Sequence, residues 1–93
     1  MNRDRILSVV VRRLKKEGAR KISLFGSYAR HEERAKSDID LLVDFPKEKT
    51  LLEIVRIERE LSEKTGKKIE LVTKNSVNPL LRETIAREME ELA

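Results

Sequence analysis

The sequence predicts an α/β fold in which helices and strands alternate along the chain in the order α-β-α-β-α-β-α. Two observations lead to this prediction. Three segments carry apolar residues at the spacing of an amphipathic helix, and three shorter segments are apolar runs or alternate between apolar and polar residues. Such alternation of elements is typical of the α/β class. No linker, repeat or low-complexity stretch interrupts the chain, so we expect one domain spanning 1–93.

The first half of the chain is expected to start with a helix near 3–17. Its apolar stripe stops before a glycine, the residue type that commonly follows the last helical turn. The stripe consists of Ile6, Leu7, Val10, Val11 and Leu14. A strand is expected near 21–26, then a short helical turn and polar loop over 28–36. A second strand near 38–45 ends at Pro46, which cannot donate a hydrogen bond to a sheet.

The second half is expected to contain two helices and one strand. Thr50 and Glu53 have the spacing of a capping box for a helix near 51–64. Its apolar stripe is wide, so it either lies wholly in the core or leaves some surface for a partner. The stripe consists of Leu51, Leu52, Ile54, Val55, Ile57 and Leu61. A strand follows near 68–73, and the Asn-Pro pair at 78–79 opens a last helix. The stripe of that helix is Leu81, Ile85, Met89 and Leu92.

Composition narrows the setting and the partners. The chain has no cysteine, which excludes disulfides and thiolate metal sites and favours a reducing cytoplasm. No apolar run approaches the roughly 18 residues that suggest a membrane span, so no membrane association is expected. The net charge is +4, with basic residues concentrated in the N-terminal third. Only three residues are aromatic, so platforms for stacking bases are scarce and a nucleic acid is not expected as a direct ligand.

The strand near 38–45 places acidic residues on one face. Asp38 and Asp40 point the same way, because successive side chains of a strand point to opposite faces. Aspartate is depleted in strands, and two carboxylates at this spacing can converge on one hard cation such as Mg²⁺, which takes oxygen ligands. A half-buried strand with a solvated acidic face, or Ser37 and Asp38 acting as turn formers, would explain the pattern equally well.

The segment upstream favours the metal-binding interpretation. An apolar run ends at Gly26-Ser27, and the residues that follow can start a helical turn. A strand that enters a helical turn through Gly-Ser presents backbone N–H groups and a hydroxyl to an anion, and glycine lets the backbone approach a phosphate closely. A phosphate cradle followed by paired acids predicts a site for a nucleoside triphosphate. Arg30 is close enough in sequence to steady the triphosphate, whereas Arg34 and Lys36 are as readily explained as solvated cations.

At these residues the chain resembles the minimal nucleotidyltransferases (MNT) of the DNA polymerase β-like superfamily. The motifs that carry the resemblance are Leu24-Phe25-Gly26-Ser27-Tyr28-Ala29-Arg30 and Ser37-Asp38-Ile39-Asp40-Leu41-Leu42-Val43. More narrowly, the chain resembles the small stand-alone MNT antitoxins that act beside HEPN-domain toxins. The resemblance covers nearly the whole chain, and it implies a polymerase β-like fold with a small mixed β-sheet packed by helices.

The resemblance also implies a set of site residues. Asp38 and Asp40 would hold Mg²⁺, with two ions at the site, and ATP would be the substrate. The residues expected to bind the nucleotide are Gly26, Ser27, Arg30 and Ser37. The family has a third carboxylate, usually aspartate, on the strand that corresponds to 68–73. This chain has Glu70 there, which would be a catalytic residue and a metal ligand, or else a solvated strand residue.

The implied reaction is the transfer of AMP from ATP to a hydroxyl, by resemblance a tyrosine of a partner HEPN toxin. Two alternatives stay open. The chain could be an antitoxin that is catalytically weak or inactive and neutralises its toxin by binding alone. It could also be a nucleotidyltransferase for a small aminoglycoside-like molecule, although 93 residues leave little chain for a second-substrate pocket.

Overall fold

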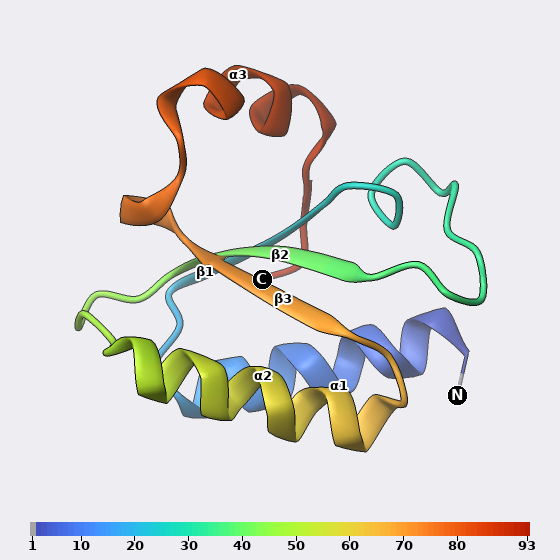
Figure 1. Ribbon diagram of the computed structural model, residues 1–93, viewed down its shortest axis with the longest axis horizontal. Coiled ribbons are helices and arrows are strands. Elements are labelled where there is room, and N and C mark those ends of the chain that lie inside the picture. The colour runs from blue at the N-terminus through green and yellow to red at the C-terminus, as the bar shows by residue number, and fades with distance from the viewer. Residues whose placement is uncertain (1) are drawn as a thin grey trace.

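A four-stranded mixed sheet with helices on both faces makes up the computed structural model, which describes residues 2–93 (Figure 1). The elements, in chain order, are α1 (Arg3–Lys16), β1 (Lys21–Phe25), β2 (Ile39–Asp44), α2 (Leu51–Thr65), β3 (Ile69–Thr73), the 3₁₀ turn η1 (Lys74–Ser76), α3 (Pro79–Glu88) and β4 (Glu90–Glu91). Within these residues, every helix is too short or too polar to cross a membrane.

The sheet has the strand order β3-β2-β1-β4. β1 pairs antiparallel with both β2 and β4, whereas β2 pairs parallel with β3. A parallel pair needs a crossover connection, and α2 supplies it between β2 and β3. The α/β class and the mixed sheet are therefore confirmed.

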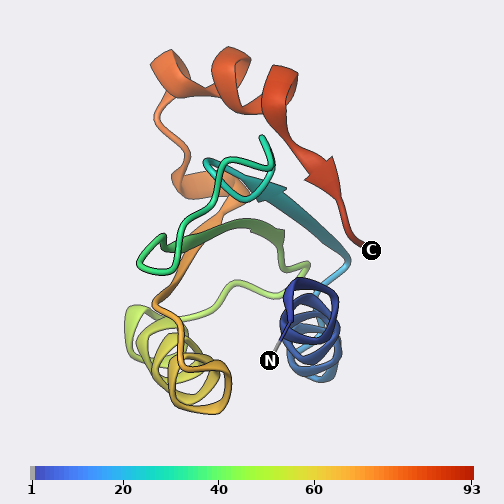
Figure 2. The same ribbon diagram turned by 90° about the vertical axis from the view of Figure 1, so that its right-hand side faces the viewer.

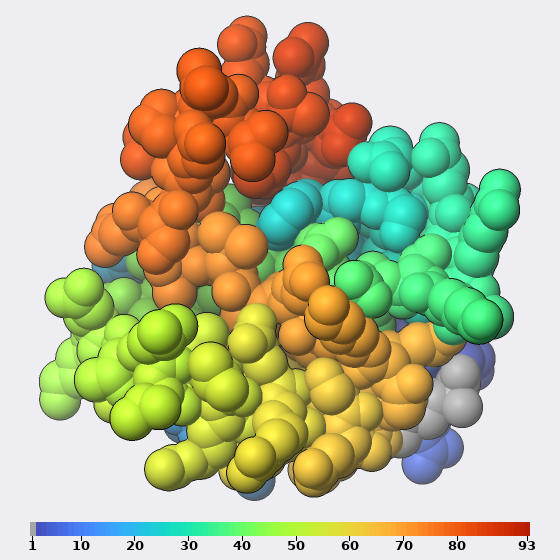
Figure 3. Space-filling view, in the orientation of Figure 1, coloured from blue at the N-terminus to red at the C-terminus, as the bar shows by residue number. Residues whose placement is uncertain are grey.

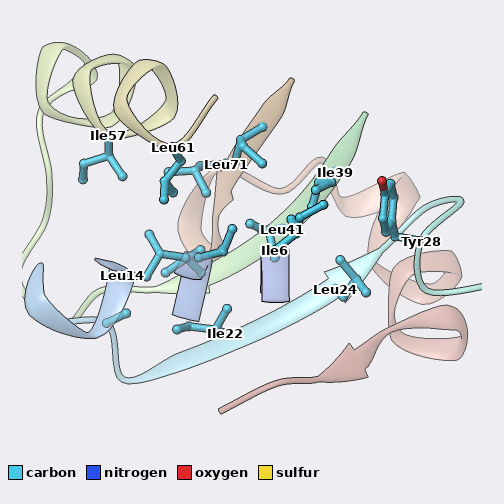
Figure 4. Close-up of a cluster of buried hydrophobic side chains, with 14 of the residues drawn as sticks. Ile6, Leu14, Ile22, Leu24, Tyr28, Ile39, Leu41, Ile57, Leu61 and Leu71 are labelled. Atoms are coloured by element: carbon cyan, nitrogen blue, oxygen red, sulfur yellow. The ribbon is translucent and has the colours of Figure 1, made fainter. Parts of the chain in front are cut away.

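α1 and α2 cover one face of the sheet, which we call the inner face (Figure 2). Alternation along β2 sends Ile39, Leu41 and Val43 to this face, and all three are fully buried. They pack with Ile6, Val10 and Leu14 of α1 and with Ile54, Ile57 and Leu61 of α2, as Figure 4 shows for most of them. The apolar side chains predicted for the core from helical spacing thus meet the strands on this side.

Caps fix the ends of α2. The Thr50 hydroxyl accepts a hydrogen bond from the backbone N–H of Glu53 at 3.2 Å, and Gly66 ends the helix in the left-handed conformation. The predicted start is confirmed and the end differs by one residue. The buried stripe of α2, however, is narrower than the set of its apolar residues. Leu51, Leu52 and Val55 lie outside the core, with exposed fractions of 78%, 79% and 48%.

The opposite face of the sheet, the outer face, is covered only in part, by α3 and the segment after β1 (Figure 2). Here the predicted start of the last helix is confirmed, with Asn78 as N-cap and Pro79 as its first residue, but the predicted stripe was wrong beyond Ile85. α3 ends at Glu88, Met89 is its C-cap, and only Ile85 of the expected stripe is buried. The chain extends at Met89 so that Glu90–Glu91 can pair with β1, and Leu92 then packs against the core. Two adjacent glutamates give no strand signal, so β4 was not predicted.

Candidate active site

Asp40 lies near the start of β2, on the outer face. The register pairs it with Phe25 of β1 on one side and with Glu70 of β3 on the other. Its neighbours along β2, Ile39 and Leu41, are fully buried on the inner face. Packing of these two residues therefore fixes the strand that carries Asp40, and the parallel register brings the carboxylates of β2 and β3 together.

Asp38 and Glu70 lie beside Asp40 and share a lysine. Asp38 directly precedes β2 and is half-exposed. The Lys68 ammonium Nζ lies 3.9 Å from Asp38 Oδ2 and 3.4 Å from Glu70 Oε1. Sequence reasoning gave Lys68 no role. The spacing could have indicated it, because Lys68 precedes Glu70 by two residues and so points to the same side of the chain.

The carboxylate of Asp40 is held in an unfavourable environment for its charge. Burial raises the pKa of Asp40 to about 6, and hydrogen bonding to Glu70 together with the negative charges of Glu70 and Asp38 contributes to the rise. The positive charge of Arg30 opposes the rise in this pKa. A cation or a proton at this point would relieve the repulsion between the carboxylates.

The turn after β1 packs directly onto Asp40. Gly26 has φ +74°, in the left-handed region that glycine tolerates best. A Cβ at this position would overlap with Asp40 Oδ2 and lie 3.3 Å from Asp40 Cγ. The turn is closed by backbone hydrogen bonds from Arg30 N to the Gly26 carbonyl at 3.2 Å and from Glu32 N to the Ser27 carbonyl at 2.9 Å. These bonds form a helical turn but no regular helix, and the turn places Gly26 against the Asp40 carboxylate.

The turn is anchored to the rest of the domain through Tyr28. This side chain is buried at the edge of the core (Figure 4), and burial raises its pKa. The Arg3 guanidinium donates to the Tyr28 carbonyl at 2.9 Å, and lies over the Tyr28 ring. The same guanidinium pairs with Glu33 and Glu90. Arg3 thus ties α1, the turn and β4 together, a contact that no sequence motif indicated.

Arg30 and Ser37, both expected to bind the nucleotide, make contacts within the protein. Arg30 pairs with Glu32 at 3.1 Å and with Glu88 at the end of α3 at 3.0 Å. The Ser37 hydroxyl accepts a hydrogen bond from Arg34 N at 2.8 Å, which is the behaviour of a turn former. Arg30 still acts on the carboxylates through its charge, whereas Ser37 shapes the loop that leads into β2.

The donor set is suited to Mg²⁺, which takes carboxylate oxygens and usually keeps substrate phosphate and water as further ligands. Asp38 and Asp40 carry such oxygens, and the negative charges of Glu70 and Asp38 are close enough to Asp40 to contribute to its raised pKa. Within residues 2–93, no three acidic, histidine or cysteine side chains are arranged to enclose a metal by themselves.

Comparison with known proteins assigns the chain to a family. The sequence profile described as polymerase beta, nucleotidyltransferase matches residues 10–93. The chain belongs to this nucleotidyltransferase family. A relative in Methanocaldococcus jannaschii, named as a candidate protein adenylyltransferase, is 44% identical over 95% of each chain. The protein adenylyltransferase MntA of Thermococcus cleftensis is 39% identical over 77% of this chain and 73% of its own length.

Solved structures of this nucleotidyltransferase fold are also similar. A chain from a crystal structure of a toxin–antitoxin pair with AMP-PNP superposes with a TM-score of 0.86, covers 94% of this chain and 72% of its own length, and is 20% identical. A chain from the complex of a tri-AMPylated Shewanella oneidensis HEPN toxin with its MNT antitoxin has a TM-score of 0.80 and 18% identity, covering 97% and 71%. At these identities the similarity confirms the polymerase β-like fold.

Proposed function

We propose that the protein transfers AMP from ATP to a hydroxyl on a partner protein. The observation that carries the proposal is the position of Asp40, which lies between the Gly26-Ser27 turn and Glu70 on the outer face of the sheet. A triphosphate bound at the turn would have its phosphates beside the carboxylates.

In this proposal each residue has a separate task. Backbone N–H groups of the Gly26-Ser27 turn and the Ser27 hydroxyl bind the β- and γ-phosphates. Asp38 and Asp40 hold Mg²⁺, and the metal, when bound, neutralises charge on the triphosphate. Arg30 and Lys68 add positive charge beside the phosphates. Ser37 supports the loop before β2. Positioning and charge neutralisation carry most of the catalysis of such reactions.

The transfer step needs a base for the acceptor. The acceptor oxygen attacks the α-phosphorus, the bond from that phosphorus to the bridging oxygen breaks, and pyrophosphate leaves. The proton of the acceptor hydroxyl passes to Glu70, which lies next to Asp40 in the register and is half-exposed. As a third carboxylate, Glu70 would also help to hold a second Mg²⁺ ion.

We further propose that the acceptor is a tyrosine of a HEPN-domain toxin and that the protein is its antitoxin, at work in the cytoplasm. Two similarities support this part. The curated relatives are named for protein adenylyltransferases, and a structure with the same fold belongs to a complex that contains an AMPylated HEPN toxin. We also regard residues 1–93 as one catalytic domain, because the family profile extends over most of that length.

The experiment is an in vitro transfer reaction with a cognate HEPN protein, ATP and Mg²⁺, followed by intact-mass analysis of the HEPN protein. The expected result is a gain of one or more AMP units in the presence of the wild-type chain and none with Asp40→Asn. Asparagine keeps the side-chain size, so the partner-binding surface should survive. A HEPN protein that is inhibited by the wild-type chain without any gain in mass would show instead that the antitoxin acts by binding alone.

A further inference from the structure

A hollow separates α3 from the outer face of the sheet. It has a volume of about 410 Å³, within the usual range for small-ligand sites. Its walls are apolar and come from both sides: Leu42 from β2, and Val77, Ile85 and Met89 from the segment that contains α3. Asn75 and Arg82 form part of its rim. An apolar wall with a few polar groups at its edge is the usual composition of a site for a small organic group.

This hollow neighbours the proposed active site along β2. Leu42 follows Asp40 by two residues on the same face of β2, a separation of about 7 Å along a strand. Its neighbours in register are Ser23 and Val72. The outer face therefore has a row that contains the carboxylates of Asp40 and Glu70, and next to it a row of Ser23, Leu42 and Val72, of which Leu42 lines the hollow.

α3 does not close over this apolar row. The helix buries only Ile85, and two of its leucines, Leu80 and Leu81, have exposed fractions of 86% and 53%. In the space-filling view, α3 projects as a lobe of its own above the rest of the domain (Figure 3). Apolar walls that are not filled by protein lose dispersion contacts, and a flat apolar ligand would restore them.

We infer that the hollow between α3 and β2 receives the adenine base of the ATP that the active site binds. This inference rests on the proposed function. The base is tied to the α-phosphate by a single ribose, so a base whose α-phosphate lies at Asp40 must lie close by, and Leu42, two residues further along β2, lines the hollow. Adenine has an apolar ring face for the walls and polar ring edges for Asn75. A chain with only three aromatic residues would thus hold the base between aliphatic side chains instead of stacking it on a ring.

Binding of the base can be distinguished from binding of the phosphates with two ligands. ATP has a base, and inorganic tripolyphosphate has none. Met89 provides the probe, because the chain has only two methionines and Met89 is partly exposed, so its truncation should leave the fold intact. In NMR spectra of protein with methyl-labelled methionine, the Met89 methyl signal is identified by its loss in Met89→Ala. In the presence of Mg²⁺, ATP should shift this signal through the ring current of adenine, and tripolyphosphate should not.

Calorimetry gives the matching affinities. Met89→Ala should weaken ATP binding by about three- to tenfold, the loss expected for one or two apolar groups, while tripolyphosphate affinity changes less than about twofold. The matched control is Leu81→Ala, which truncates an exposed apolar residue of the same helix outside the hollow and should change neither affinity.

The outcomes distinguish this inference from the proposed function. If ATP binds but leaves the Met89 signal in place and Met89→Ala binds it normally, the base lies elsewhere and the inference is wrong. The same holds if the signal moves only when the acceptor protein is added, because the hollow would then belong to the acceptor. If the wild-type chain with Mg²⁺ binds neither ATP nor tripolyphosphate, the proposed function fails, and this inference fails with it.

Discussion

The two faces of the sheet differ in what they contribute. The inner face is a closed apolar layer in which Ile39, Leu41 and Val43 of β2 meet two helices and are fully buried. The outer face carries Asp40, Leu42 and Asp44 of the same strand, all half-buried, and only α3 and a turn stand over it. A six-residue strand thus serves stability with one set of alternate residues and chemistry with the other. This division explains how a small domain can place Asp40 beside Glu70 without losing its core.

Among the substitutions compared here, the largest effect is expected at Glu70 on the outer face, which should change the rate of transfer without changing substrate binding. Glu70→Gln should slow transfer by about 10²–10⁴-fold, the usual contribution of a positioned base, and leave ATP–Mg²⁺ binding nearly unchanged. Glu70→Asp should restore much of the rate. The measurement is single-turnover transfer followed by mass analysis, with the exposed α2 residue Glu63 changed to Gln as the control. A change of less than a few-fold for Glu70→Gln would remove Glu70 from the site.

The inner face should matter for stability alone, and two adjacent leucines test this. Leu41→Ala removes a fully buried side chain and should lower the free energy of unfolding by about 2–5 kcal/mol. Leu42→Ala, on the outer face beside the hollow, should lower it by about half as much or less. Urea unfolding of both variants gives the comparison. Equal losses would mean that the outer face is packed as tightly as the inner one.

The glycines allow a finer comparison, because Gly26 and Gly66 have almost the same backbone angle, with φ of +74° and +71°. An alanine at either position should cost about 1–3 kcal/mol of stability through backbone strain. Only at Gly26 would the new Cβ also push against Asp40, since nothing lies within 4 Å of a Cβ at Gly66. Gly26→Ala should therefore weaken ATP–Mg²⁺ binding, and Gly66→Ala should not. Similar binding by both variants would contradict the close packing of turn and carboxylate.

The smallest effect concerns the stability of the metal-free protein as pH changes. The pKa of Asp40 is raised to about 6 in the folded state, above its ordinary value, so the folded protein binds more protons than the unfolded chain between about pH 4 and pH 6. Asp40 should thus reduce stability as pH rises through this window. Asp40→Asn, which carries no charge, should melt at a higher temperature than wild type above pH 6, and the difference should shrink toward pH 4. A constant difference across this range would contradict the raised pKa.

Much of the inner face could be predicted from the sequence, because periodicity reports which residues are buried. Alternation in β2 and the stripe of α1 correctly indicated the core, and the Thr50 cap located α2. The outer face was harder. The end of α3 at Glu88 depends on pairing with β1, a contact between distant segments that leaves no local pattern. The same is true of Arg3, whose contact with the Tyr28 carbonyl joins residues far apart in the chain.

The arrangement of the acidic residues of the site could be predicted only in part. Two-residue spacing correctly put Asp40 and Glu70 on the face away from the core, but their register across two strands comes from the parallel pairing of β2 and β3. The contacts of Arg30 with Glu32 and Glu88, and of Lys68 with Asp38, depend on side chains from separate elements. Sequence motifs therefore indicated which acidic residues lie together, and the structure adds which acidic side chains Arg30 and Lys68 contact.

We propose that the outer face of the sheet binds ATP through a metal held by Asp38 and Asp40. The direct measurement is a calorimetric titration of ATP into wild-type and Asp40→Asn protein, each with Mg²⁺ and with EDTA. Without the metal, the carboxylates and the phosphates repel each other as like charges. We therefore expect the wild-type protein to bind ATP only with Mg²⁺, and the folded Asp40→Asn variant to bind none in either condition. Equal ATP affinity with Mg²⁺ and with EDTA would contradict it.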